Sequence, residues 1–165
     1  EDLDFFNQNQ FDPQQLQTEL LRFGKLKNTE LAAGTLNTFL NETKLQFLEY
    51  PYPLLEPKQD WLGISLSSII DIACTKLQTI SMRGSKKDFT DLFFLLERYS
   101  LQNLLETMEK KYSGLDYSQT HILKSLVYFE DANKQPMPRM HKQVRWENIM
   151  SRITEAVKTI FFSLD

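Results

Sequence analysis

The spacing of apolar positions divides the chain into a strand-rich front and a helical back. Between residues 28 and 50 the apolar side chains come in short runs rich in β-forming residues, separated by Gly34 and by Asn41-Glu42. This pattern predicts two or three antiparallel strands. From Leu66 onward apolar residues recur at intervals of three and four, which indicates amphipathic helices. We predict helices near 66–83, 89–99, 101–112, 118–128 and 144–162, with a loop at 131–138.

One more helix is predicted within the front part. Asp12-Pro13 has the form of an N-cap followed by proline at the first helical position, so a helix should continue to about Phe23. The fold class is therefore α+β, a small mixed or antiparallel sheet with a C-terminal helical bundle. We expect residues 1–60 to form the strand-rich part, and residues 61–165 to form a helical part packed as one unit with it.

Composition narrows the class of protein without indicating an activity. The 165 residues are 41% hydrophobic and 25% charged, with a formal net charge of -3, as in one ordinary globular domain. The single cysteine, Cys74, cannot form an internal disulfide, which favours the reducing cytoplasm. No apolar run approaches the ~20 residues of a membrane span. The chain begins at Glu1 without an initiator methionine, so we expect a fragment.

The first candidate site is the opening stretch Glu1-Asp2-Leu3-Asp4-Phe5-Phe6. If it is a strand, Asp2 and Asp4 project from one face while Leu3 and Phe5 project from the other. Two carboxylates held side by side repel each other unless a cation lies between them, and Mg²⁺ is commonly held by one or two carboxylates together with substrate phosphates. The alternative is a solvated turn or N-cap cluster, for which Asp is well suited.

A second group of charges lies on the predicted helices. Lys76 and Arg83 are seven residues apart, on the shoulder of the apolar stripe of one helix, from which each could reach a neighbouring cleft or remain at the helix edge. Asp88 follows Ser85 at capping-box spacing. Asp91 interrupts an apolar run, so it should be buried with a partner, either Arg83 or Lys87, or lie beside a metal cleft.

The remaining candidates carry weaker signals. Glu49 shares a predicted strand face with Leu45 and Phe47, and could be a third metal ligand or could emerge into solvent at the strand end. His121 and His141 have no acid or nucleophile at catalytic spacing, and no Gly-rich phosphate loop is present. The two tryptophans, Trp61 and Trp146, are interpreted as core residues.

Taken in order, four segments resemble the AbiEii/AbiGii-type nucleotidyltransferases, bacterial proteins of which many are toxins of toxin–antitoxin or phage-abortive systems. The segments are EDLDFF at 1–6, YPYPLL at 50–55, DIACTKLQTISMRGSKKDFTDLFFLL at 71–96 and YFEDANKQPMP at 128–138. The segment 71–91 is the most specific. The family pattern begins with a Gly-Gly or Gly-Ser turn ahead of the acids, and no such turn precedes Asp2 in these 165 residues.

The resemblance implies a polymerase-β-like nucleotidyltransferase fold, and a cytoplasmic enzyme that moves a nucleotidyl group from an NTP to an acceptor hydroxyl. It suggests tRNA or another RNA as acceptor, an antitoxin protein as partner, and two Mg²⁺ ions. The resemblance implies metal binding by Asp2 and Asp4, to which the strand argument above adds Glu49. Catalysis would use Asp2, Asp4, Lys76 and Asp91, and the nucleotide would meet Lys76, Arg83, Lys87 and Asp88. Lys76 would contact phosphates or support the cleft.

Two other interpretations remain open. A non-catalytic or truncated member of the family could serve as a protein-interaction module, for example for an antitoxin. A purely structural α+β domain would explain the core but not the order of the motifs.

Nucleotidyl transfer needs little covalent help from the protein, because positioning and charge neutralisation by Mg²⁺ and cations supply most of the catalysis.

Overall fold

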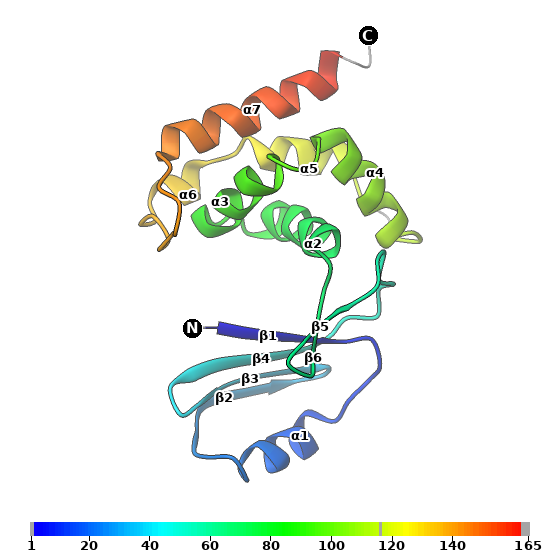
Figure 1. Cartoon of the computed structure of the whole chain (residues 1–165), viewed down its shortest axis with the longest axis vertical. Helices are drawn as coiled ribbons and strands as arrows, with labels where there is room; N and C mark the ends of the chain where they lie inside the picture. Colours follow the sequence, from blue (N-terminus) through cyan, green and yellow to red (C-terminus); the bar gives the residue numbers. More distant parts are fainter. Residues whose placement is uncertain (1, 116, 163–165) are drawn as a thin grey trace. The chain divides into compact units, whose positions relative to one another are not determined.

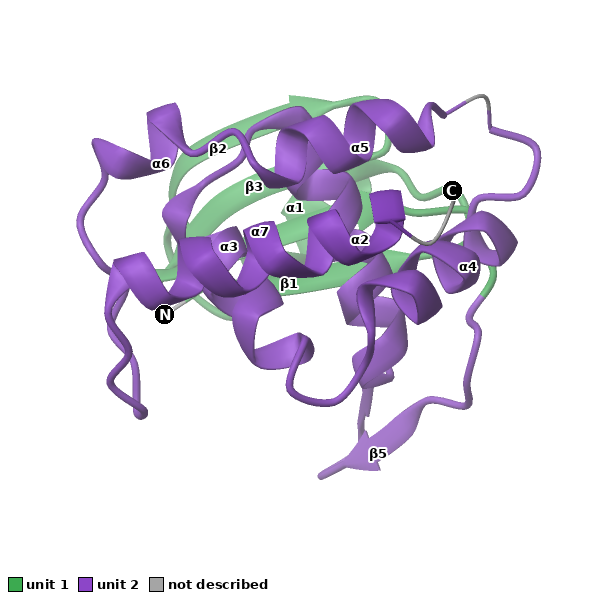
Figure 2. Ribbon diagram, turned by 90° about the horizontal axis from the view of Figure 1, so that it is seen from above, with its two compact units in different colours: residues 1–53 green, residues 54–165 purple. Residues whose placement is uncertain are grey.

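The structure is a computed structural model that describes residues 2–115 and 117–162. The chain divides into two compact units, residues 1–53 and residues 54–165 (Figure 2). The division falls seven residues before the boundary predicted from the sequence, so residues 54–60 belong with the helical unit. Packing of the two units as one body stays a prediction, and each unit is described by itself.

Unit 1 contains a four-stranded sheet in the order β1-β4-β3-β2 (Figure 1). The strands are β1 (Asp2–Asn7), β2 (Leu26–Ala32), β3 (Thr35–Leu40) and β4 (Thr43–Glu49). The last three form the antiparallel meander that the short apolar runs predict, while β1 runs parallel to β4. The sheet is therefore mixed, and its parallel pair joins the first strand to the last one of the meander.

The two faces of this sheet differ in chemistry. One face carries the buried side chains Leu36, Thr38 and Leu45, and helix α1 (Pro13–Leu20) packs against β2 and β3. Asp12 caps α1 as predicted, accepting a hydrogen bond from the Gln14 amide at 2.8 Å. The other face is mostly polar, and β1 contributes its two aspartates to it.

A short β-hairpin opens unit 2 where the sequence predicted a connection and the start of a helix. Strands β5 (Gln59–Trp61) and β6 (Ile64–Leu66) are joined by Leu62 and Gly63, with φ values of 54° and 80°. Both values are positive, as a type I′ turn requires. The expectation of a helix from Leu66 was wrong, and Trp61, expected in the core, is 57% exposed.

The rest of unit 2 is a helical bundle, in agreement with the predicted fold class. Its helices are α2 (Ile69–Met82), α3 (Lys86–Leu95), α4 (Leu101–Lys111), α5 (Gln119–Leu126), α6 (Glu130–Asn133) and α7 (Trp146–Phe162). Helix α2 packs against α3, α4 and α5, while α7 packs against the same three helices (Figure 1). Only α6 was missed, because a loop was predicted there. No helix in the described part of the chain is long and apolar enough to cross a bilayer.

Candidate active site

The first group of candidate site residues is an acid pair on β1, in unit 1. In the parallel pairing, Asp2 is opposite Lys44 and Asp4 is opposite Gln46, so both aspartates project from one face while Leu3 and Phe5 project from the other. The Phe5 ring stacks on Phe47 at a centroid distance of 4.8 Å and fixes this orientation. Both aspartates are exposed, and within the described residues neither carboxylate forms a salt bridge or hydrogen bond.

The strand register separates Glu49 from the two aspartates. Glu49 pairs with Asn7, five positions from Lys44, and an odd offset along a strand places a side chain on the opposite face. Its carboxylate instead lies against Gly34, where an added Cβ would come within 2.8 Å of Glu49 Oε2. As a shared ligand with Asp2 and Asp4, the expected third carboxylate does not fit this sheet.

Two carboxylates on one face still fit a hard divalent cation. No group of three or more His, Cys, Asp or Glu side chains within the described residues is arranged to hold a metal ion. Mg²⁺ retains several waters and is usually bound by one or two carboxylates plus substrate phosphates, so a pair of exposed acids matches its requirements. Asp2 and Asp4 would be the protein ligands, with the substrate completing the site.

The second group of candidate site residues is a charged cluster centred on Lys76 of α2, in unit 2. Lys76 Nζ lies 2.7 Å from Asp91 Oδ2 and 3.2 Å from Asp88 Oδ1. Burial alone lowers the pKa of the Lys76 ammonium, but its hydrogen bond to Asp91 and the charges of both aspartates outweigh this and hold that pKa above its ordinary value. Lys76 is therefore a positive charge held in place on helix α2.

Asp88 is the buried acid of this cluster. Its side chain is fully buried and accepts hydrogen bonds from Arg83 Nε at 3.2 Å and from the Ser85 hydroxyl. Ser85 is the N-cap of α3 and its hydroxyl accepts the Asp88 amide, so the helix start predicted from this spacing is confirmed. Burial raises the pKa of Asp88, yet Ser85, Arg83 and Lys76 together bring it below its ordinary value.

Asp91 and Lys87 differ from their sequence-based expectations. The Asp91 side chain is 41% exposed, and its partner is Lys76, neither of the two cations expected. One carboxylate oxygen is held by the lysine while the group remains open to solvent. Lys87 is exposed on the first turn of α3, and the structure does not bring it into the cluster of Lys76, Arg83, Asp88 and Asp91.

A second buried ion pair was not predicted. Lys111 Nζ, at the end of α4, lies 2.6 Å from Asp71 Oδ1, and both side chains are at most 3% exposed. Asp71 also accepts the Ser68 hydroxyl at 2.6 Å and the Leu55 amide at 3.1 Å. Ser68 and Asp71 have the same capping-box spacing as Ser85 and Asp88. This spacing was the one signal in the sequence that could have drawn attention to Asp71. This pair ties the segment after residue 53 to helices α2 and α4.

These two buried aspartates predict how unit 2 responds to acid. Burial raises the pKa of Asp71, but the hydrogen bonds from Lys111, Ser68 and Leu55 hold it below its ordinary value of 3.8, and that of Asp88 is lowered too. A lowered folded-state pKa gives stability that is complete above the unfolded value and is lost as pH falls through the folded one.

We therefore expect the urea midpoint of unit 2 to fall with pH below about 4, the ordinary range of an Asp carboxyl. Asp88→Asn should flatten the slope of this fall, because one proton fewer is taken up on unfolding. The midpoint is measured between pH 2.5 and 7. An unchanged acid slope in Asp88→Asn would contradict the assignment.

Lys86 and Cys74 belong to the packing of unit 2. Lys86 is buried with its ammonium group 5.0 Å from the centroid of the Trp146 ring and donates to the Gln135 carbonyl. Phe89 and Phe129 pack beside Trp146, which is half-buried at the edge of the core that was expected to contain it. Burial raises the pKa of the Cys74 thiol to about 11, which keeps it protonated and unreactive.

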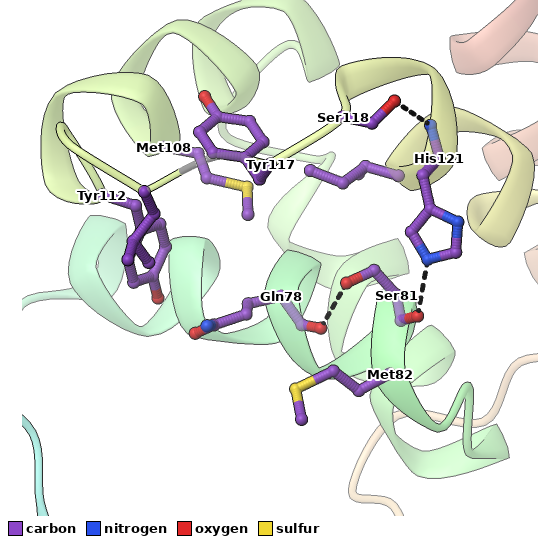
Figure 3. A pocket seen from close by; sticks show the side chains of 10 residues that line it. Gln78, Ser81, Met82, Met108, Tyr112, Tyr117, Ser118 and His121 are labelled. Carbon is purple, nitrogen blue, oxygen red and sulfur yellow. Dashed lines mark hydrogen bonds between the residues drawn. The ribbon is translucent and has the colours of Figure 1, made fainter.

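A hollow of about 420 Å³ lies between α2, α4 and α5 (Figure 3). His121 Nε2 is 3.2 Å from the Ser81 carbonyl oxygen on one side of it, and Met108 and Tyr112 lie on another. The described residues that line this hollow include no Asp, Glu, Lys or Arg. They therefore lack the groups that stabilise a transferring phosphoryl group, and the hollow is distinct from the Lys76 cluster.

Comparison with known proteins agrees with the order of these motifs. Residues 44–162 match the family described as nucleotidyl transferase AbiEii toxin, type IV TA system. The chain belongs to this AbiEii family. The matched range contains β4 from its second residue onward and the whole Lys76 cluster, and begins after the strand that carries Asp2 and Asp4. The AbiEii match therefore does not depend on the acid pair.

One curated protein and one solved structure are similar to this chain over nearly its whole length. The uncharacterized protein aq_aa25 of Aquifex aeolicus (strain VF5) is 37% identical over 164 residues, which is 96% of this chain and 78% of that protein. The crystal structure of JHP933 from Helicobacter pylori matches 99% of this chain and 76% of its own, with a TM-score of 0.51 at 14% identity. The second likeness concerns the fold alone.

Proposed function

We propose that this chain is a Mg²⁺-dependent nucleotidyltransferase that moves a nucleotidyl group from an NTP to an acceptor hydroxyl on RNA, with tRNA as the first candidate. In the cell it would act in the cytoplasm as the toxin of a type IV toxin–antitoxin system, with an antitoxin protein as its partner. The observation that carries the proposal is the Lys76 cluster, an ordered set of cations and acids in the segment that identifies the AbiEii family.

The residues divide the work between charge neutralisation and orientation. Asp2 and Asp4 would hold Mg²⁺, which when bound neutralises the triphosphate and activates the attacking hydroxyl. Lys76 supplies a cation whose direction is fixed by two aspartates, suited to a phosphate oxygen. Asp91 keeps a carboxylate open to solvent, where it can orient the acceptor hydroxyl. Asp88 holds Lys76 and Arg83 in place and would act through them.

Incorporation of labelled NTP into a tRNA pool tests this proposal directly. With each of the four NTPs and Mg²⁺, the parent protein should label RNA, and Asp4→Ala should lower the rate by at least 10²-fold because the metal loses a ligand. Asp60→Ala, at an exposed aspartate of the β5–β6 hairpin, is the control and should retain the parent rate. Equal labelling by the parent and Asp4→Ala would refute the metal-site assignment.

A further inference from the structure

Strand β4 was expected to supply Glu49 as a third acid. It instead places Lys44 and Gln46 beside the two aspartates of β1. Lys44 is the register partner of Asp2, and Gln46 is that of Asp4, so these two β4 side chains emerge on the face of the aspartates. Paired strands lie about 5 Å apart, which puts the long, flexible Lys44 side chain within reach of both carboxylates. Lys44 is half-buried, while its two acidic neighbours are exposed.

Lys44 is distinguished from the other cations of unit 1 by position. Lys27 occupies the same row on the same face, because it pairs with Phe39, which in turn pairs with Lys44. It lies three strands from Asp2, or about 14 Å, beyond the range of a direct contact. Among the cations in the described part of unit 1, Lys44 alone is paired in register with either aspartate.

We propose that Lys44 is a substrate-positioning residue: its ammonium group offsets part of the charge of Asp2 and Asp4 through space, without a salt bridge, in the free protein, and contacts a phosphate of the nucleoside triphosphate once a metal ion occupies the pair. This rests on the proposed function. Two adjacent carboxylates make the local potential negative and so favour a nearby cation, and a lysine on a flexible stem can turn from them to another anion. A phosphate brought in by the metal would be the nearest new anion for it.

The two roles have opposite effects on binding. Without Lys44 the carboxylate pair is more negative, so a metal ion alone should bind more tightly, by about fivefold for one unit charge some 4 Å away in an exposed site. A nucleotide with its metal should bind more weakly, by about tenfold, because one charge-assisted hydrogen bond is lost. A residue that only supports the strand would change both affinities in the same direction.

Isothermal titration of the full chain measures both constants. In Lys44→Met we expect Mn²⁺ alone to bind about fivefold tighter, and a non-hydrolysable NTP analogue with Mg²⁺ to bind about tenfold more weakly. Lys44→Arg should keep nucleotide binding within about threefold of the parent. Lys27→Met is the control for general charge, and should leave both constants unchanged.

Unchanged constants in Lys44→Met, shifts of both in one direction, or equal shifts in Lys27→Met would overturn the role of Lys44. If Asp4→Ala nevertheless abolishes RNA labelling, the proposed function stands and only the lysine proposal fails. If the parent binds neither Mn²⁺ nor the nucleotide analogue, both proposals fail together.

Discussion

Replacing Lys111 by Met should destabilise unit 2 by about 3–5 kcal/mol, the usual cost of leaving one member of a buried ion pair uncompensated. The Asp71 carboxylate that remains is 3% exposed and would keep only neutral donors, among them the Ser68 hydroxyl and the Leu55 amide. Domains of this kind are stable by about 5–15 kcal/mol in total, so the loss is a large share. A thermal midpoint lowered by on the order of 10 °C is expected.

Two further variants isolate the cause. Lys110→Met changes the neighbouring, exposed lysine of α4 and should cost no more than about 0.5 kcal/mol, the usual range for surface substitutions. Asp71→Asn combined with Lys111→Met removes both charges and should recover part of the loss. Urea denaturation of the four proteins measures these differences. A double variant less stable than Lys111→Met would show that the uncompensated charge is not the source of the loss.

The buried ion pair of Lys111 and Asp71 also shows what could be predicted from the sequence and what could not. Local signals were sufficient where they act over one turn, as at Asp12, Ser85 and Asp88. The same capping-box spacing at Ser68 and Asp71 indicates that a helix starts there, but it does not indicate which cation pairs with Asp71. Lys111 is forty residues away in the chain, and only the packing of α4 against α2 brings it to Asp71.

Strand register was the second limit of prediction. Alternation along β1 correctly predicted that Asp2 and Asp4 share a face, because period two is a property of the strand alone. Which face of β4 joins them depends on how the strands align, and a shift of one residue reverses every side chain. The sequence therefore predicted that Glu49 shares a face of β4 with Leu45 and Phe47. It could not predict that this face lies opposite to the one that carries Asp2 and Asp4.

The β5–β6 hairpin illustrates a third limit, that of turn chemistry. Its two-residue turn is Leu62-Gly63, and a leucine at positive φ is uncommon, because its Cβ crowds the backbone there. The usual signals for such turns, Asn-Gly and Asp-Gly, are absent at this position. The apolar residues on either side could therefore be interpreted as the start of a helix.

The largest effect on activity with the fold preserved should come from Asp91→Asn. The Asp91 side chain, which pairs with Lys76, is 41% exposed. Exposed ion pairs contribute about 0–1 kcal/mol to stability, so the urea midpoint should hardly move. Nucleotidyl transfer should fall by about 10²–10⁴-fold, the range for a group that manages the proton of an attacking hydroxyl. RNA labelling and urea denaturation are measured on the same preparation.

Asp88→Asn is the matched comparison, since Asp88 binds the same lysine from a fully buried position. It should lose about 2 kcal/mol of stability, because a buried acceptor of charged hydrogen bonds is weakened, while Lys76 keeps Asp91 as a partner. Its activity should fall less than that of Asp91→Asn at a temperature where both are folded. If Asp91→Asn instead loses stability and keeps its rate, the solvent-exposed carboxylate is a structural partner of Lys76 and another group must orient the acceptor.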